Sequence, residues 1–312
     1  MKRYLYVSDK NVYKANLHCH TTVSDGAYTP EEIKKVYTLR GYNIVSFTDH
    51  NILESHGYLN DETFLAINAC EVNINAPRNG GFTNAPTYHF NLFATKPDMV
   101  DTPPLPKMEY HDVEAINKYI ADRTQEGYLV CYNHPYWSLQ TYEEYHRLKG
   151  CFAMEIYNHN CEVDEGYYGY NPQVYDEMLR GGSKLFCLST DDNHNAGPVD
   201  LPDRDSFGGF VYVNCNSLQY HDVIDALING AFYSSQGPEV YEISLEANEL
   251  TVKCSPVEKI IVYTQGRKCY VKIGEALEGA TFQLSGNEEY IRVMCRDKDK
   301  KDANSNAYWL NA

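Results

Sequence analysis

Short apolar segments that end in polar residues are the feature of this sequence that most restricts its fold. Between residue 13 and about residue 236, such segments alternate with segments of helical periodicity, in about seven units. This alternation is typical of an α/β sheet or barrel. We therefore expect a first, α/β domain over residues 1–237, with strands at residues 13–17, 43–50, 65–73, 87–94, 128–135, 152–158, 184–194 and 207–214.

The first helix of this domain is specified by its own sequence. Thr29 provides an N-cap, Pro30 occupies the first helical position, and Glu32 completes a capping box. Gly41 ends the helical pattern. The helix should therefore start directly after the turn that contains Asp25.

Beyond residue 237 the helical periodicity disappears, and short alternating segments are separated by turn residues. About seven short strands at regular spacing predict a small antiparallel β-sandwich. We expect this second domain over residues 238–312, with strands at residues 241–247, 250–255, 259–265, 268–274, 280–285, 289–296 and 307–310.

Composition restricts the partners of the chain. The 312 residues include 43 acidic and 27 basic side chains, a net charge of −16, which repels a polyanion over most of the surface. Extended nucleic-acid binding is therefore not expected. The sequence has no apolar run of membrane-spanning length and no evident export signal, and its ten cysteines lack the spacing of a disulfide framework. These features favour a cytoplasmic protein without a membrane partner.

Nine residues with metal-binding side chains lie at or just after the ends of expected strands. The carboxyl ends of strands build the active site in parallel α/β architectures. Six of the eleven histidines belong to this set, which indicates one common site rather than scattered positions. The nine residues are His18, His20, Asp25, His50, Glu71, His89, His134, Asp192 and His194.

Alternation along a strand places His18 and His20 on the same face and Cys19 on the opposite one. Imidazole and carboxylate ligands together suit Zn²⁺, Mn²⁺ or Fe²⁺. Because nine ligands exceed the needs of one ion, we expect two to three divalent metal ions. Such clusters bind phosphate oxygens and turn a bound water into hydroxide, so a small phosphorylated substrate is the expected partner.

The order of these motifs resembles the PHP family, named for polymerase and histidinol phosphatase. The motifs are His-x-His, Ser-Asp-Gly, Thr-Asp-His, a strand-end Glu, a strand His, Asn-His-Pro and Asp-x-His, over residues 16–236. The resemblance implies a distorted, TIM-like (β/α)7 barrel with a trinuclear metal centre that hydrolyses phosphoesters. The segment near residues 208–240 is also similar to a subgroup of metal-dependent phosphoesterases in which a small β-domain follows the barrel.

By motif position, the resemblance implies a ligand set for each ion. Asp192 is preferred to Asp191 because its two-residue spacing to His194 matches Asp-x-His, and Asp191 would orient a neighbouring ligand. The first ion would be held by His18, His20, Glu71 and Asp192, the second by His89 and His134 with Glu71 as a bridge, and the third by Asp25, His50 and His194.

The expected reaction is hydrolysis of a phosphomonoester or nucleotide by a metal-bridged hydroxide at a di- or trinuclear centre. The residues expected to carry catalysis are Glu71, Asp192 and His194, and His194 or a water on the third ion is a candidate proton donor to the leaving group. Substrate contacts are expected from Arg204 and Arg78, which could bind phosphate, from Tyr136, which could stack, and from Asn158.

Two other functions remain open from the sequence. A metal-dependent amidohydrolase also opens with His-x-His on a barrel strand, although a catalytic strand-end Asp and often a carboxylated Lys bridge would be expected there. A non-catalytic, metal-stabilised binding protein would use the barrel as a scaffold. Phosphoester and amide substrates, and the presence or absence of turnover, separate these alternatives.

Overall fold

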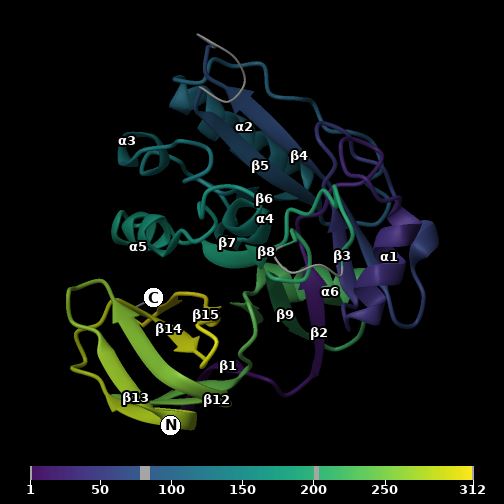
Figure 1. The fold of residues 1–312 in the computed structure, drawn as a ribbon. Helices are drawn as coiled ribbons and strands as arrows, with labels where there is room; N and C mark the ends of the chain where they lie inside the picture. Colours follow the sequence, from purple (N-terminus) through teal and green to yellow (C-terminus); the bar gives the residue numbers. More distant parts are fainter. Residues whose placement is uncertain (1, 78–84, 200–203, 311–312) are drawn as a thin grey trace.

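A single mixed sheet organises the chain in the computed structural model, which describes residues 2–77, 85–199 and 204–310 (Figure 1). Its strands are β1 (Lys2–Val7), β2 (Asn11–Asn16), β3 (Ile44–Phe47), β4 (Leu65–Asn75), β5 (Thr87–Ala94), β6 (Tyr128–Tyr132), β7 (Ala153–Asn158), β8 (Phe186–Thr190), β9 (Phe210–Cys215), β10 (Phe232–Ser235), β11 (Val240–Glu246), β12 (Glu249–Thr264), β13 (Tyr270–Gln283), β14 (Tyr290–Arg296), β15 (Asp302–Ser305) and β16 (Tyr308–Trp309).

Six α-helices and one 3₁₀ turn connect these strands within the described ranges. They are α1 (Pro30–Leu39), η1 (Gly57–Leu59), α2 (Val113–Glu126), α3 (Tyr142–Tyr145), α4 (His159–Val163), α5 (Pro172–Arg180) and α6 (Tyr220–Ile228). The first helix forms as predicted, with a complete capping box. The Thr29 hydroxyl accepts from the backbone N–H of Glu32, and the Glu32 carboxylate accepts from the backbone N–H of Thr29. Ile33 and Tyr37 bury its inner face.

The first part of the sheet follows the order β9-β2-β3-β4-β5-β6-β7-β8. The pairs β2/β3, β3/β4, β6/β7 and β7/β8 are parallel, whereas β9/β2, β4/β5 and β5/β6 are antiparallel. All eight expected strands are present, so the α/β class is confirmed. The predicted distorted, TIM-like (β/α)7 barrel is not clear in the described residues, because antiparallel pairs interrupt the parallel order and the named strands form an open path.

The chain segments that follow β2 and β8 nevertheless pair with each other. Cys19 and Asn193 form an isolated parallel bridge after β2 and β8. The N–H of His20 donates to the Asn193 carbonyl at 3.0 Å, and the N–H of Asp192 donates to the His18 carbonyl at 2.9 Å. This backbone pairing brings the His-x-His segment and the segment around Asp192 together.

The C-terminal part of the sheet differs from the predicted small sandwich of short strands. Residues 250–255 and 259–265 lie in the single strand β12, and residues 268–274 and 280–285 fall largely in β13. The N-terminal strand β1 also belongs here, since it pairs with β11 (Figure 1). The sheet continues across the predicted domain boundary at residue 237, because β15 pairs with β10. The boundary itself stays a prediction.

A buried ion pair joins the C-terminal strands to the helical side of the molecule. The guanidinium of Arg292 in β14 donates from Nε and Nη2 to the two carboxylate oxygens of Asp176 in α5, at 2.6 and 2.7 Å. Only 1% of the Arg292 side chain is exposed. Two parallel bonds of this kind fix both the distance and the angle between the two groups.

None of the helices in the described ranges combines the length and apolar character needed to cross a membrane.

Candidate metal centre

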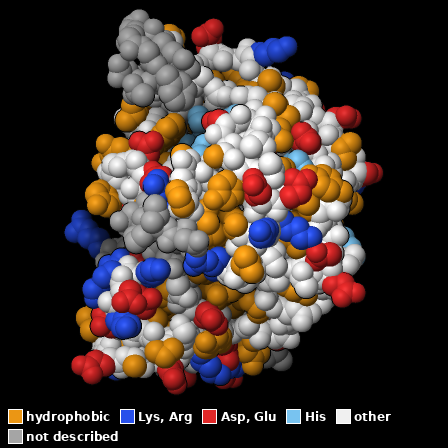
Figure 2. Space-filling view, turned by 45° about the vertical axis from the view of Figure 1, so that its right-hand side comes forward, with side chains coloured by type: hydrophobic (Ala, Val, Ile, Leu, Met, Phe, Trp, Pro, Cys, Tyr) orange, Lys and Arg blue, Asp and Glu red, His pale blue; other side chains and the backbone are white. Residues whose placement is uncertain are grey.

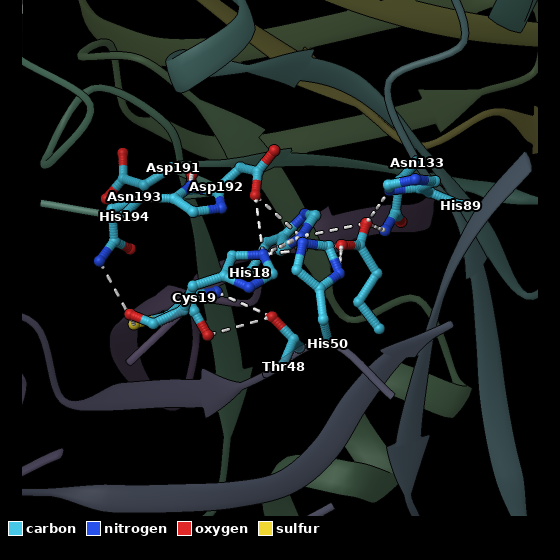
Figure 3. Close-up of polar contacts among 12 residues, drawn as sticks. His18, Cys19, Thr48, His50, His89, Asn133, Asp191, Asp192, Asn193 and His194 are labelled. Atoms are coloured by element: carbon cyan, nitrogen blue, oxygen red, sulfur yellow. Dashed lines mark hydrogen bonds and ion pairs between the residues drawn. The ribbon is translucent and has the colours of Figure 1, made fainter. Parts of the chain in front are cut away.

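The nine predicted ligands come from segments far apart in the sequence and meet in one place. Their ligand atoms form overlapping groups within 4.8 Å of one another. Figure 3 shows His18, His50, His89 and Asp192 gathered around the same point. Seven of the nine line a cavity of about 330 Å³, and His18 and His20 lie buried beneath it. Histidine side chains are visible within a hollow of the surface in Figure 2.

Glu71, near the middle of β4, lies between two sets of histidines. Its Oε1 lies 3.0 Å from Nδ1 of His89 and 3.3 Å from Nε2 of His134. Its Oε2 lies 3.0 Å from Nδ1 of His50. Asn133 also donates from Nδ2 to Oε1 at 2.8 Å. The two oxygens therefore face different histidines, as a bridging carboxylate requires.

His18, His20 and Asp192 form the deepest part of the cluster. Nε2 of His18 lies 3.1 Å from Nε2 of His20, and Oδ1 of Asp192 lies 3.0 Å from each of these nitrogens. Despite this proximity, Oδ1 is buried without an aligned hydrogen-bond donor. Two ligands of one tetrahedral Zn²⁺ ion would lie about 3.3 Å apart. These three atoms therefore have the spacing of ligands that converge on an ion.

Asp25 lies at the mouth of the cavity, with its side chain 53% exposed. Its Oδ1 is 3.5 Å from Nδ1 of His20 and 3.6 Å from Nε2 of His194, and its Oδ2 is 3.5 Å from Nε2 of His50. These four side chains form one group of ligand atoms. The Asp25-Gly26 turn lies against the backbone of His20, since a Cβ at Gly26 would lie 2.5 Å from the His20 carbonyl.

Burial and mutual charge set the protonation of this cluster. Burial lowers the pKa of His20 to about 4, and the rings of His194 and His50 act in the same direction. Burial alone would raise the pKa of Glu71, but the rings of His89 and His18 outweigh it and hold this pKa well below its usual range. Burial alone would lower the pKa of His18 and His134, but the neighbouring carboxylates outweigh it and raise both pKa values. A metal ion would therefore displace protons from these two rings when it binds.

Two of the predicted ligands have unusual backbone conformations. His134 has φ 24° and Asp192 has φ 54°. Left-handed backbone costs energy for residues other than glycine, although Asp tolerates it better than most. Such conformations persist where the surroundings fix them, and they cluster at functional sites. Each residue lies two positions beyond the end of a strand, β6 or β8, so the strained turns direct these side chains into the cluster.

Glu155 in β7 supports two of the candidate ligands through hydrogen bonds. It is fully buried, and its Oε1 accepts from Nδ1 of His18 at 2.7 Å and from the hydroxyl of Thr190 at 2.6 Å. Its Oε2 accepts from the N–H of His134 at 3.0 Å and from Nδ2 of Asn158 at 2.9 Å. Glu155 thus turns Nε2 of His18 toward Glu71 and Asp192.

Asp49 and Asp191, which each precede a predicted ligand, stabilise backbone turns through hydrogen bonds. Asp49 accepts from Thr21 and from Ser24, through both their N–H groups and their hydroxyls, so it shapes the turn that carries Asp25. It does not bond to the neighbouring His50 ring. Asp191 accepts from Tyr37 and from the N–H groups of residues 207–209 at 2.8–2.9 Å. Burial raises the pKa of Asp191 to about 7, against the effect of these donors.

The predicted substrate-binding residues occupy varied positions, and their role stays a prediction. Asn158 is buried and donates from Nδ2 to Oδ2 of Asp192 at 3.0 Å, so it positions a candidate ligand. Tyr136 is 55% exposed and packs edge-on against another tyrosine. The guanidinium of Arg204 packs against Gly197, outside the set of residues that line the cavity. Arg78 lies outside the described residues.

Several residues that line the cavity were not assigned to the site from sequence. They lie in the segments after β7 and β8, which the strand-end argument could have indicated. Asp205 accepts from the N–H groups of His194 and Asn195 at 2.7 and 2.8 Å and so fixes the loop of a candidate ligand. The others are Asn160, Asp164, Glu165 and Ala196.

No family model matches this chain, and none of the curated proteins matches it. Among solved structures, it is similar to a two-domain protein from Bacteroides vulgatus that contains a predicted PHP-like metal-dependent phosphoesterase. The TM-score is 0.52 at 15% sequence identity, and the match covers 99% of this chain and 97% of that chain.

Two further structures match a smaller part of the chain, each with a TM-score of 0.37 and 14% identity. One, from Bifidobacterium adolescentis, is provisionally named a metal-dependent phosphoesterase, and the match covers 59% of this chain and 89% of that chain. The other is an amidohydrolase from Chromobacterium violaceum with bound sulfate and no metal, and the match covers 58% and 87%. The resemblance to PHP-like proteins that the motifs predict is confirmed, by the Bacteroides vulgatus structure, at the level of the fold.

Proposed function

We propose that this protein is a metal-dependent phosphoric ester hydrolase that acts on a small phosphate ester, a phosphomonoester or a nucleotide. The observation that carries the proposal is the position of Glu71. Its Oε1 faces His89 and His134, the proposed ligands of one ion, and its Oε2 lies 3.6 Å from Nε2 of His20, a proposed ligand of another, as a carboxylate shared between the two ions would. The PHP-like fold supports the same conclusion.

The residues present fit two or three Zn²⁺, Mn²⁺ or Fe²⁺ ions. His89, His134 and Glu71 would hold one ion, and His18, His20 and Asp192, again with Glu71, would hold another. Asp25, His50 and His194 would hold a third. Such ions, when bound, supply a water of lowered pKa as the nucleophile and positive charge for the phosphate oxygens.

The side chains of the protein would hold this centre in shape during the reaction. Glu155 would keep the Nε2 of His18 directed into the cluster, and Asn158 would hold Asp192 in the same way. His194 lines the cavity and is partly exposed, so it could pass a proton to the leaving group when only two ions are bound. With a third ion it would serve as a ligand instead.

No lysine or arginine lines the cavity among the described residues. The charge of a bound phosphate would then be balanced by the ions alone, so the activity should depend strictly on metal. The same absence disfavours the amidohydrolase alternative, since a carboxylated lysine bridge would have to come from a lysine in this cavity. All ten cysteines are unpaired, which supports a reducing, cytoplasmic location.

The proposal can be tested with protein that is loaded with Mn²⁺, Zn²⁺ or Fe²⁺ under anaerobic conditions. Its activity is measured on phosphomonoesters, nucleotides and amides. We expect turnover of phosphoesters, its loss with a chelator and its return with metal. His134→Ala should lower kcat by orders of magnitude, whereas His221→Ala, at an exposed histidine of α6, should not. Turnover of amides alone would favour the amidohydrolase, and bound metal without any turnover would favour the binding protein.

A further inference from the structure

A cavity of about 340 Å³ lies at the far end of two strands that carry residues of the candidate metal centre. Residues 146–151 and 178–185 contribute its walls. The first segment leads into β7, which carries Glu155, and the second leads into β8, which is followed by Asp192. Because the cavity lies at the amino ends of these strands, it is separate from the cluster at their carboxyl ends. We call this space the Lys184 pocket.

The floor of the Lys184 pocket is apolar. Leu148, Met178 and Leu185 line it and are buried. Cys151 adds a thiol whose pKa burial raises to about 12, so this thiol stays neutral at physiological pH. Small-molecule sites typically combine a volume of this size and an apolar lining with a few polar groups. The floor therefore suits a hydrocarbon chain or an aromatic ring.

Cationic side chains surround this floor. Lys149, Lys184 and His146 line the pocket, and no aspartate or glutamate lines it among the described residues. Within the described ranges neither lysine forms an ion pair, whereas Lys34 and Lys118 each pair with an aspartate. In a chain of net charge −16, an anion is repelled over most of the surface and attracted to such a place.

The position of Lys184 is not explained by the end of the neighbouring helix α5. Two carbonyls at that end already accept from the N–H groups of Gly182 and Ser183, so they need no lysine to bond them. The Nζ of Lys184 lies 5.4 Å from the ring centroid of Trp309, which orients the side chain. Its ammonium group remains available to a ligand.

We propose that the Lys184 pocket binds a small organic anion, with its apolar body on the floor and its charged group beside Lys149 and Lys184. The two ammonium groups would bind the charged group through charge-assisted hydrogen bonds, and the floor would remove the apolar body from water. A bound anion would connect the two segments that precede β7 and β8. The inference does not depend on the proposed hydrolase function.

Two aromatic probes of the same shape and different charge test the site. The anion is para-trifluoromethylbenzoate, and para-trifluoromethylbenzamide is its neutral counterpart. We expect fluorine NMR to show saturable binding of the benzoate, about tenfold or more tighter than that of the benzamide. Lys149→Gln combined with Lys184→Gln should bring the two affinities together. Lys35→Gln, at an exposed lysine of α1, should leave the preference unchanged.

A methionine methyl signal locates the bound probe. The chain has six methionines, and Met178→Leu identifies the methyl signal of Met178 in an NMR spectrum. This signal should shift as the benzoate is added, while the signal of Met294 in β14 stays. The benzoate should bind equally well to metal-loaded and chelator-treated protein. Equal affinity for the two probes, an unmoved Met178 signal, or binding that disappears with the metal would overturn the pocket proposal and leave the hydrolase proposal standing.

Discussion

Oε1 of Glu155 lies 2.7 Å from Nδ1 of His18, which leaves Nε2 of the same ring directed at Glu71 and Asp192. The four donors around Glu155 satisfy both of its oxygens, so a fully buried carboxylate is held without strain or an unpaired charge. Carboxylates that bind the second nitrogen of a ligand histidine fix the orientation of the ring and raise its basicity. Glu155 therefore positions a ring of the candidate metal centre.

Replacing Glu155 by glutamine should weaken metal binding about 10- to 100-fold. The amide keeps the size of the carboxylate but removes its charge and one of its acceptor oxygens. Titration of the metal-free protein with Mn²⁺ or Zn²⁺ measures the affinity, and Glu109→Gln provides a matched control on the surface. Unchanged metal affinity in the Glu155 variant would show that the contact serves packing alone.

Metal removal should lower the thermal stability of the protein. Ions that bound the folded cluster and had no comparable site in the unfolded chain would stabilise the fold by about 2.7 kcal/mol at a hundredfold excess over Kd. Thermal unfolding followed with and without a chelator measures the shift in Tm. The shift should be smaller in His89→Ala, which removes one ligand. Equal Tm values for metal-loaded and metal-free wild-type protein would contradict a metal centre.

Substitutions at Asp192 should separate its charge from its backbone conformation. Asn tolerates a left-handed backbone nearly as well as Asp, so Asp192→Asn removes the charge at φ 54° with little strain. Asp192→Ala adds a strain of about 1 kcal/mol. We expect both variants to lose turnover by orders of magnitude and only the alanine variant to lose stability in urea. Substantial turnover in Asp192→Asn would contradict the role of this residue as a ligand.

The Arg292–Asp176 pair should matter for the attachment of the C-terminal strands. Asp176→Leu leaves a guanidinium buried without its partner, which costs about 3–5 kcal/mol of unfolding free energy. Adding Arg292→Met to that variant should recover much of the loss, because a buried pair can often be replaced by apolar side chains. Urea unfolding of the two single variants and the double variant measures the coupling. Additive losses would show that the pair contributes no specific coupling.

The candidate ligands could be predicted because their positions follow a local rule. Each expected strand could be recognised from a few apolar residues, and the polar residue at its end could be read without knowing the rest of the fold. The capping box of Thr29 and Glu32 is local in the same sense. Cys19 also lies in the core beside Ile33, as alternation with His18 and His20 predicts.

The features that the sequence did not predict depend on distant contacts. Glu155 bonds to a ring 137 residues away, and its own segment gave no sign of this partner. The sequence predicts two strands where the structure has the single strand β12. This strand continues through Pro256, with a shift of register between Lys253 and Val257. A proline has no N–H for the ladder, and a bulge is a place where a strand tolerates that loss.

The strand β1 pairs with β11, so Lys2 lies opposite Glu246 in the finished sheet. Closing so long a loop carries a large entropic cost before any ladder bond repays it. On the ribosome, β1 has no template until the residues of β11 (Val240–Glu246) have been translated. Until then its unpaired edge is free to associate with other chains, so this ladder is a late step of assembly and a point of exposure to aggregation.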